Sequence, residues 1–139
     1  MKVYTGTDII EIERVKDSIE NIGEKFIEEI YTKKEIEYCE SRKKAKYQHY
    51  AARFAAKEAI FKAVSKLLNN KFDISWKNAE IMNDENGRPS INFLHTKITE
   101  KIQDIDISIS HCKEYAVATV VVISKWRSKN ELIWFTCTL

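Results

Sequence analysis

The chain is poor in residues that break regular structure, with only three glycines and one proline among 139 residues. This scarcity excludes collagen-like and low-complexity segments, which need such residues in abundance. Its three cysteines, Cys39, Cys112 and Cys137, are scattered and include no CxxC pair. They suit neither a disulfide framework nor a structural zinc site, so we expect a reducing, cytoplasmic location.

An excess of one charge is also missing, because 23 basic residues nearly balance 21 acidic ones, for a net charge of +2. We therefore expect no nucleic-acid partner, and any anion-binding site must be local. No stretch approaches membrane-spanning length, and the N-terminus lacks the apolar run of a signal peptide, so we expect no membrane partner. What is present, 44% hydrophobic and 32% charged residues, predicts one globular domain with a substantial core.

The spacing of apolar residues predicts an α+β fold, a small, mostly antiparallel sheet packed against a long helix and shorter helices. Strands are expected over residues 2–12, 75–82, 105–110 and 115–123, with another ending at Phe93. Helices are expected over roughly 12–30, 32–42, 46–69 and 95–102. Gly23 interrupts the first helix, and Thr32 and Glu35 have the spacing of a capping box that opens the second. Val and Ala dominate residues 115–123, which favours a central strand.

Two segments divide the chain unequally. Residues 1–124 form the predicted domain, and residues 125–139 form a C-terminal extension of unknown role. The extension is a polar hinge followed by the apolar run Leu132 to Phe135. Docking on the domain, pairing with another subunit and disorder are all open for it.

The long predicted helix carries four charges although it is otherwise apolar on two faces. Its large stripe contains Tyr50, Phe54, Phe61, Val64 and Leu68, and its small stripe contains Ala52, Ala56, Ala59 and Ala63. Arg53 and Lys57 are four residues apart on the helix, where like charges repel by about 0.2–0.5 kcal/mol. This placement of two cations is explained most easily by an anion that lies between them. Glu58 and Lys62 share a flank at the same spacing. An ordinary salt bridge is the alternative, because ion-pair networks also occur without function.

Two further positions are candidates for chemistry. Asp8 shares a strand face with Ile10 and Ile12, where a carboxylate is costly unless it is paired or bound to metal. The alternative is that this face is the exposed side of an edge strand. His111 lies at the tight connection between two predicted strands, where a base, a phosphate ligand and a simple turn residue are all possible.

Asp8 and Glu58 together offer two hard oxygen ligands on different elements, which is what Mg²⁺ prefers. Arg53, Lys57 and Lys62 are then available to bind phosphate oxygens around the metal. This combination is typical of phosphate-ester chemistry, where positioning and charge neutralisation do most of the work. The glycine motifs of P-loop and dinucleotide-binding proteins are absent from the sequence.

Four segments resemble the holo-acyl-carrier-protein synthases, the short, single-domain type of 4′-phosphopantetheinyl transferase. They are Gly6–Val15, Arg53–Ala63, Ile109–His111 followed by Tyr115–Ala118, and the turn Asn86–Pro89. The resemblance runs in order from about residue 3 to residue 123. After the long helix it weakens, because the family has a glycine-containing turn where this chain has Val64–Asn70.

The resemblance implies transfer of the phosphopantetheine arm of coenzyme A to a serine of apo acyl carrier protein, which releases adenosine 3′,5′-bisphosphate. Asp8 and Glu58 would ligate Mg²⁺, and with Lys62 they would be the catalytic residues. Lys57, Lys62 and His111 would contact coenzyme A phosphates, and Arg53 would support that pocket. The serine proton would go to a metal-bound water or to a neighbouring carboxylate.

The resemblance also implies a homotrimer with active sites at subunit interfaces. The acidic carrier protein, of fatty-acid biosynthesis or of a secondary pathway, would dock on the first helix. Arg14 is the contact that we expect there, with Lys16 and Lys25 as further candidates. Two other functions remain open: a non-catalytic carrier-binding or coenzyme-binding module of the same fold, and an Mg²⁺-dependent enzyme acting on nucleotides.

Overall fold

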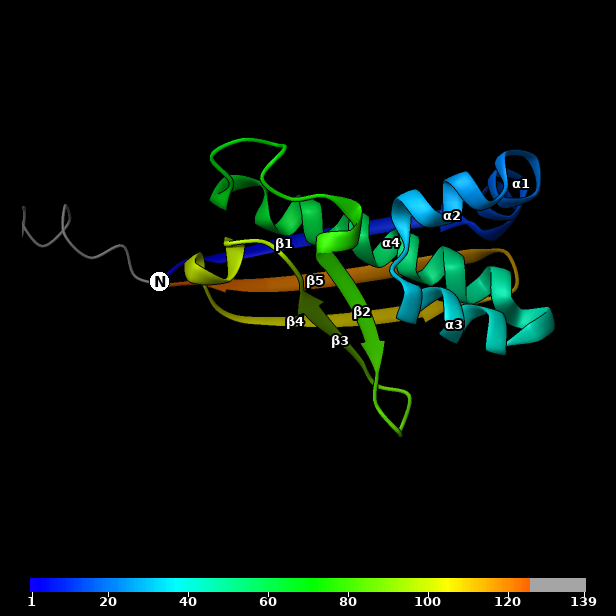
Figure 1. Cartoon of the computed structure of the whole chain (residues 1–139). Coiled ribbons are helices and arrows are strands. Elements are labelled where there is room, and N and C mark those ends of the chain that lie inside the picture. The colour runs from blue at the N-terminus through cyan, green and yellow to red at the C-terminus, as the bar shows by residue number, and fades with distance from the viewer. Residues whose placement is uncertain (126–139) are drawn as a thin grey trace, which may run out of the picture.

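The computed structural model of the chain describes residues 1–125. The main sheet contains three antiparallel strands, β1 (Val3–Glu11), β5 (Tyr115–Ser124) and β4 (Ile102–His111), paired in that spatial order (Figure 1). The Val-rich strand β5 is central, as its composition predicts. Within residues 1–125, strands β2 (Ala79–Asn83) and β3 (Pro89–Phe93) pair only with each other, so this part of the chain forms two antiparallel sheets. The predicted α+β class is confirmed.

The helices follow the predicted order. They are α1 (Ile12–Ile22), α2 (Glu24–Ile30), α3 (Lys33–Ser41) and α4 (Lys46–Val64), joined in part by the 3₁₀ turns η1 (Lys43–Ala45), η2 (Ser65–Leu67), η3 (Trp76–Asn78) and η4 (Ile98–Lys101). Gly23 separates α1 from α2 with a φ of 79°, a left-handed value that glycine adopts without strain. The capping box is confirmed: Glu35 N donates to Thr32 Oγ1, and Thr32 N donates to Glu35 Oε1.

Three boundaries differ from the sequence prediction. Helix α4 ends at Val64 rather than near residue 69, because Asp73 Oδ2 accepts hydrogen bonds from the backbone N–H groups of Asn69 and Asn70 and holds this segment as a loop. The first residues of the strand predicted at 75–82 form η3, which Ser75 caps by donating its backbone N–H to Asn78 Oδ1. The helix predicted at 95–102 is only the single turn η4.

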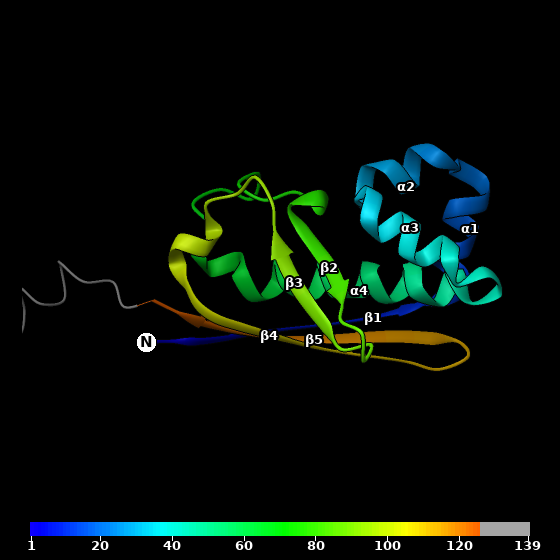
Figure 2. The same cartoon turned by 60° about the horizontal axis from the view of Figure 1, so that its bottom comes forward.

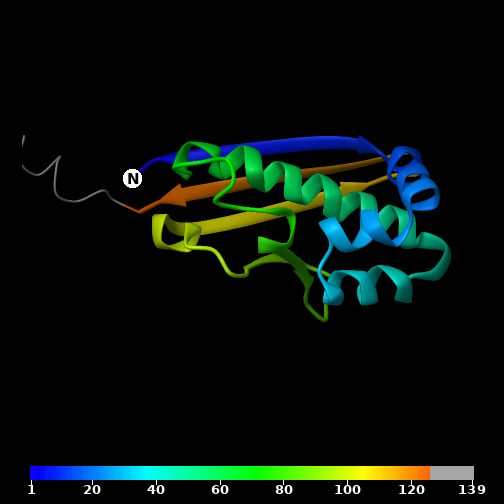
Figure 3. The same cartoon turned by 45° about the horizontal axis from the view of Figure 1, so that its top comes forward.

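Helix α4 lies across one face of the main sheet and packs against β1 and β5 (Figure 3). Gly6 of β1 makes this close approach possible. A Cβ there would overlap the carbonyl oxygen of Ala59 and lie 2.7 Å from the nitrogen of Ala63. The small-residue stripe of α4 therefore packs backbone against backbone, as the alanine spacing predicts.

Helices α1 to α4 and the β2–β3 hairpin lie on one side of the main sheet, which forms an outer layer of the described structure (Figure 2). Within residues 1–125, no helix is both long enough and apolar enough to cross a membrane. The C-terminal extension predicted from residue 125 onward lies, apart from Lys125, outside the described residues.

Candidate functional site

Asp8 and Lys62 meet where α4 crosses β1. Lys62 Nζ donates hydrogen bonds to Asp8 Oδ1 at 2.9 Å and to the carbonyl oxygen of Thr7 at 2.8 Å. Asp8 is on the strand face toward α4, with 18% of its side chain exposed, whereas 52% of the Lys62 side chain is exposed. The structure therefore places Asp8 on an inward face at a sheet edge, with a cation beside it.

Glu58 completes this group from the preceding turn of α4. Partial burial raises the pKa of the Glu58 carboxyl, the nearby Asp8 carboxylate raises it further, and the Lys62 ammonium lowers it. Lys62 thus pairs directly with Asp8 and acts on Glu58 only through its charge, so one lysine faces two carboxylates. We call Asp8, Glu58 and Lys62 the carboxylate cluster.

The carboxylate cluster has the chemistry of a Mg²⁺ site. Mg²⁺ takes one or two carboxylates from a protein and keeps its other positions for water and substrate phosphates. Two carboxylates that lie close together repel each other, and a bound divalent cation would reduce this repulsion. No group of three or more His, Cys, Asp or Glu with metal-site geometry occurs within residues 1–125, so the cluster is a two-carboxylate site.

Lys57 requires a correction to the sequence interpretation. Its ammonium contacts Glu35 Oε1 at 2.8 Å and donates to the carbonyl oxygens of Trp76 and Ala79, each at 2.8 Å. The side chains of Lys57 and Glu35 are both 0% exposed. All three donors of the ammonium are therefore used inside the protein, which argues against the coenzyme phosphate contact predicted for Lys57.

Within residues 1–125 Arg53 makes no salt bridge, so of the two cations only Lys57 has an anionic partner, which is Glu35 of the chain itself. Its second carboxylate oxygen accepts the backbone N–H of Ile81 at 3.0 Å, which links α3 to β2. Close by, Glu80 accepts the Thr32 hydroxyl. Sequence reasoning recognised Glu35 only as a capping-box residue. Its second role depends on contacts between segments far apart in the sequence, and the local pattern carries no signal for it.

Arg53 belongs with Lys57 rather than with the carboxylate cluster. It is buried, its Nη2 donates to Asn83 Oδ1 at 2.7 Å, and its guanidinium carbon lies 4.1 Å from the centre of the Tyr38 ring. Among the described residues, its buried Nε has no hydrogen-bond partner. Its contacts thus lie on α3 and on the β2–β3 hairpin.

His111 lies at the end of β4, on the opposite edge of the main sheet from Asp8. Strand β5 separates the two, so the strand axes are about 10 Å apart. The His111 ring packs against that of His49 of α4, with centroids 5.7 Å apart. Burial, followed by the charges of Arg53, His111 and Arg42, lowers the pKa of His49 to about 4.

Helix α4 consequently presents two chemically different flanks. One residue turns an α-helix by about 100°, so Arg53 and Lys57 face α3 and the hairpin while Glu58 and Lys62 face β1. Within one chain, the structure brings Asp8, Glu58 and Lys62 together. It places Arg53, Lys57 and His111 elsewhere.

A cavity of about 510 Å³ lies beside the C-terminal end of α4. Its walls include Phe61, Ser65 and Trp76. Ser65 Oγ donates to the carbonyl oxygen of Lys62 at 2.8 Å, which places this cavity against the helical turn that carries Lys62. The Trp76 ring lies against Phe61 with centroids 5.0 Å apart, so one wall is aromatic.

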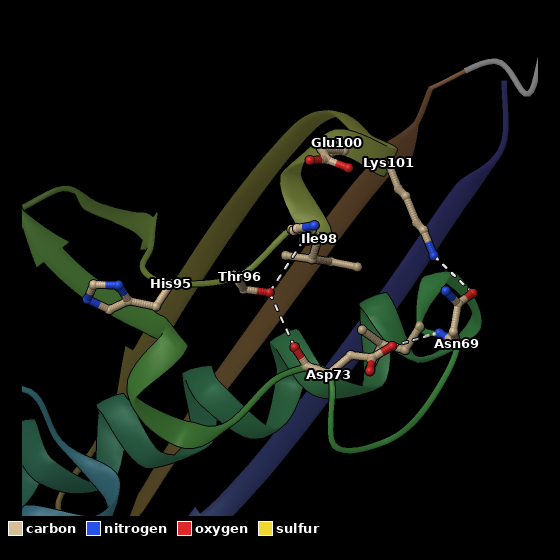
Figure 4. Close-up of a pocket in the computed structure, with 9 residues that line it drawn as sticks. Asn69, Asp73, His95, Thr96, Ile98, Glu100 and Lys101 are labelled. Atoms are coloured by element: carbon tan, nitrogen blue, oxygen red, sulfur yellow. Dashed lines mark hydrogen bonds between the residues drawn. The ribbon is translucent and has the colours of Figure 1, made fainter.

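Figure 4 shows a second cavity, of about 580 Å³, between the loop after α4 and the η4 turn. Lys101 reaches across it and donates to the Leu67 carbonyl oxygen and to Asn69 Oδ1. Thr96 Oγ1 donates to the carbonyl oxygen of Asp73. Lys101 and Thr96 are thus engaged with neighbouring groups, and no residue of the carboxylate cluster lines this cavity.

Arg14, the expected carrier contact, is exposed on α1, the helix that directly follows β1. Lys16 lies 3.9 Å from Glu13, whereas Arg14 makes no salt bridge within residues 1–125. Its guanidinium is therefore available to a partner.

Comparison with known proteins defines the class. A model of the 4′-phosphopantetheinyl transferase superfamily matches residues 4–120, and the chain belongs to this family. The holo-[acyl-carrier-protein] synthase of Ruminiclostridium cellulolyticum is 44% identical over 137 residues, which cover 95% of this chain and 100% of that protein. The corresponding synthase of Dehalococcoides mccartyi is 43% identical over 123 residues, or 86% of this chain and 97% of that protein. The family predicted from the motifs is confirmed.

Solved structures show the same fold. A holo-(acyl-carrier-protein) synthase from Bacillus anthracis str. Ames, in complex with CoA (3′,5′-ADP), has a TM-score of 0.73 at 36% identity and covers 88% of this chain and 96% of its own. A synthase–CoA complex from Chronobacterium ammoniagenes has a TM-score of 0.77 at 25% identity, with coverages of 91% and 100%.

Proposed function

We propose that this chain transfers the 4′-phosphopantetheine group of coenzyme A to a serine of an apo acyl carrier protein, in a reaction that depends on Mg²⁺. The observation that carries the proposal is the carboxylate cluster of Asp8, Glu58 and Lys62, in a chain that belongs to this transferase family. Relatives named as holo-[acyl-carrier-protein] synthases support the carrier as substrate, and CoA-bound neighbours support coenzyme A as donor.

Each residue of the cluster has a proposed role. Asp8 and Glu58 would hold Mg²⁺, which when bound supplies positive charge to the diphosphate during transfer. Lys62, half exposed at the rim, binds and orients a phosphate oxygen of coenzyme A. The half-buried position of Asp8 and Glu58 reduces solvent screening, which strengthens these charge interactions.

We further propose that the active site is completed between subunits of a homotrimer. His111 lies on the far side of β5 from Asp8, and Arg53 contacts α3 and the hairpin. Within one chain, these two residues expected at the coenzyme site therefore lie apart from the expected metal ligands. The sheet face away from α4 supports association, because it exposes Val3 and Ile9, each 62% exposed, and Val121. An uncovered apolar sheet face is typical of a surface that a partner covers.

The remaining parts of the proposal concern the carrier and the cell. Arg14 would contact an acidic acyl carrier protein, and fatty-acid biosynthesis is one pathway that would supply such a carrier. A cytoplasmic location is supported by the free thiols of Cys39 and Cys112. The domain would end at Ser124, where β5 ends.

Intact mass spectrometry of the carrier tests this function. The purified chain is incubated with coenzyme A, an apo acyl carrier protein and Mg²⁺, with a parallel reaction in chelator. We expect a mass increase equal to one phosphopantetheine only with Mg²⁺. An unmodified carrier that nevertheless binds the chain would instead indicate a binding module, and nucleotide release with an unmodified carrier would indicate a hydrolase. The mass increase in chelator would contradict the Mg²⁺ requirement.

A further inference from the structure

We propose that Lys62 competes with the divalent cation for Asp8, so that metal binding releases the Lys62 ammonium to the phosphate of the substrate. The inference rests on the metal site of the proposed function and adds an exchange to it. It starts from one contact: Lys62 Nζ lies 2.9 Å from Oδ1 of Asp8, a residue whose carboxylate is proposed to bind the metal.

The geometry makes simultaneous occupation unfavourable. An ammonium at 2.9 Å from Asp8 Oδ1 occupies the space beside that oxygen that a metal ion at about 2.1 Å would need. The two cations would also repel each other across a half-buried oxygen. A metal ion on Asp8 therefore either displaces Lys62 from Oδ1 or binds Oδ2 beside it, and in both cases it weakens the contact with Lys62.

The release of Lys62 is structurally easy. Its side chain is half exposed, and its other acceptor is the carbonyl oxygen of Thr7 at the surface. Exposed lysine–carboxylate pairs contribute only about 0–1 kcal/mol, so a change of rotamer costs little. Lys57 is the contrasting case, because its side chain is fully buried and its ammonium has three partners inside the protein.

The exchange has a consequence for substrate binding. Once freed from Asp8, the Lys62 ammonium is a mobile cation beside the metal site, where a diphosphate would lie. A diphosphate that accepts Lys62 then stabilises the metal-bound state, and the metal in turn stabilises the diphosphate-bound state. The two ligands are therefore expected to bind with positive coupling.

Direct metal binding tests the inference without catalysis. Mn²⁺, which takes the same oxygen ligands as Mg²⁺, is titrated into the full chain without coenzyme A, and free Mn²⁺ is followed by electron paramagnetic resonance. We expect Lys62→Met to bind Mn²⁺ about three- to tenfold more tightly than the wild type, since the competing cation is gone. Lys66→Met is the matched control: it removes an exposed positive charge one turn further along, and its affinity should stay within about twofold of wild type.

Coenzyme A supplies the second arm. In the wild type, saturating coenzyme A should raise Mn²⁺ affinity, and in Lys62→Met this gain should shrink severalfold. Unchanged or weaker Mn²⁺ binding by Lys62→Met, or an equal gain in Lys66→Met, would overturn the exchange, as would a lack of binding by both the wild type and Lys62→Met. The carrier mass assay decides the proposed function separately, so either idea can fail while the other stands.

Discussion

Two lysine–carboxylate pairs on α4, five residues apart, have nearly the same length and opposite characters. Lys57 contacts Glu35 at 2.8 Å and Lys62 contacts Asp8 at 2.9 Å. The first pair is sealed inside the protein and fully hydrogen-bonded, while the second is half open to solvent and faces another carboxylate. Sequence spacing treats these lysines alike, since both lie on one charged helix.

Their surroundings determine what each pair can do. Removing one partner of a buried ion pair leaves an uncompensated charge and costs about 3–5 kcal/mol, whereas an exposed pair contributes about 0–1 kcal/mol. The Lys57 pair therefore fixes α3, η3 and β2 against α4. The Lys62 pair holds its partners loosely enough to exchange them for a ligand. A short distance alone distinguishes neither role.

The largest expected effect follows from removing either carboxylate of the carboxylate cluster. Asp8→Ala or Glu58→Ala should reduce Mg²⁺-dependent transfer below detection, because each removes one of the two proposed metal ligands. Carrier mass measures transfer, and thermal unfolding checks that the fold persists. Wild-type turnover in either variant would remove that residue from the metal site.

Disrupting the buried Lys57–Glu35 pair should instead lower the stability of the fold. We expect Lys57→Met or Glu35→Leu to lower the free energy of unfolding by about 3–5 kcal/mol, because each leaves a charge buried without its partner. Urea denaturation measures both variants and their combination. The double variant should cost clearly less than the two single losses added together. Lys62→Met is the control, with an expected loss below about 1 kcal/mol. Equal losses at the two lysines would contradict the distinction between the pairs.

The same contrast explains how far the sequence predicted the molecule. Period and capping located nearly every element, because those signals are local: Thr32 and Glu35 open α3, and Gly23 separates two helices. The close packing predicted by the alanine stripe of α4 is also found, at Gly6. Element ends were wrong where a side chain hydrogen-bonds to the backbone and stops the regular pattern, as Asp73 does after α4.

For the site, the sequence carries a signal where the chemistry is unusual within its own segment. A carboxylate at Asp8, among inward-facing apolar residues, already indicated a partner. Lys57 lies away from the carboxylate cluster because its partner Glu35 comes from another helix, and the helical pattern of α4 contains no sign of that contact. Burial separates a structural lysine from a functional one, and burial is a property of the whole fold.

The flank of α4 that carries Lys57 should also show a pH dependence through His49. Burial lowers the His49 pKa to about 4, so between pH 6.5 and 4 the unfolded chain binds a proton that the folded chain does not. The free energy of unfolding is therefore unaffected by His49 protonation above pH 6.5, and it decreases as the pH falls below that value because only the unfolded chain takes up the proton. We expect His49→Gln to reduce the loss between pH 7 and pH 5 by about 1–2 kcal/mol, measured by urea unfolding at both values. An unchanged pH dependence would show that His49 titrates normally in the folded state.

The smallest expected effect concerns docking of the carrier protein on α1, the helix that directly follows β1. Arg14→Glu should raise the KM for the carrier about three- to fivefold and leave the KM for coenzyme A unchanged, because an exposed charge contributes modestly to a docking surface. The ratio between variant and wild type should shrink as salt rises, since screening weakens both attraction and repulsion. Lys25→Glu, on α2, is the matched charge reversal and should have a weaker effect. An unchanged carrier KM in Arg14→Glu would show that Arg14 is not part of the docking surface. The carboxylate cluster would then be the only functional feature proposed near the junction of β1 and α1.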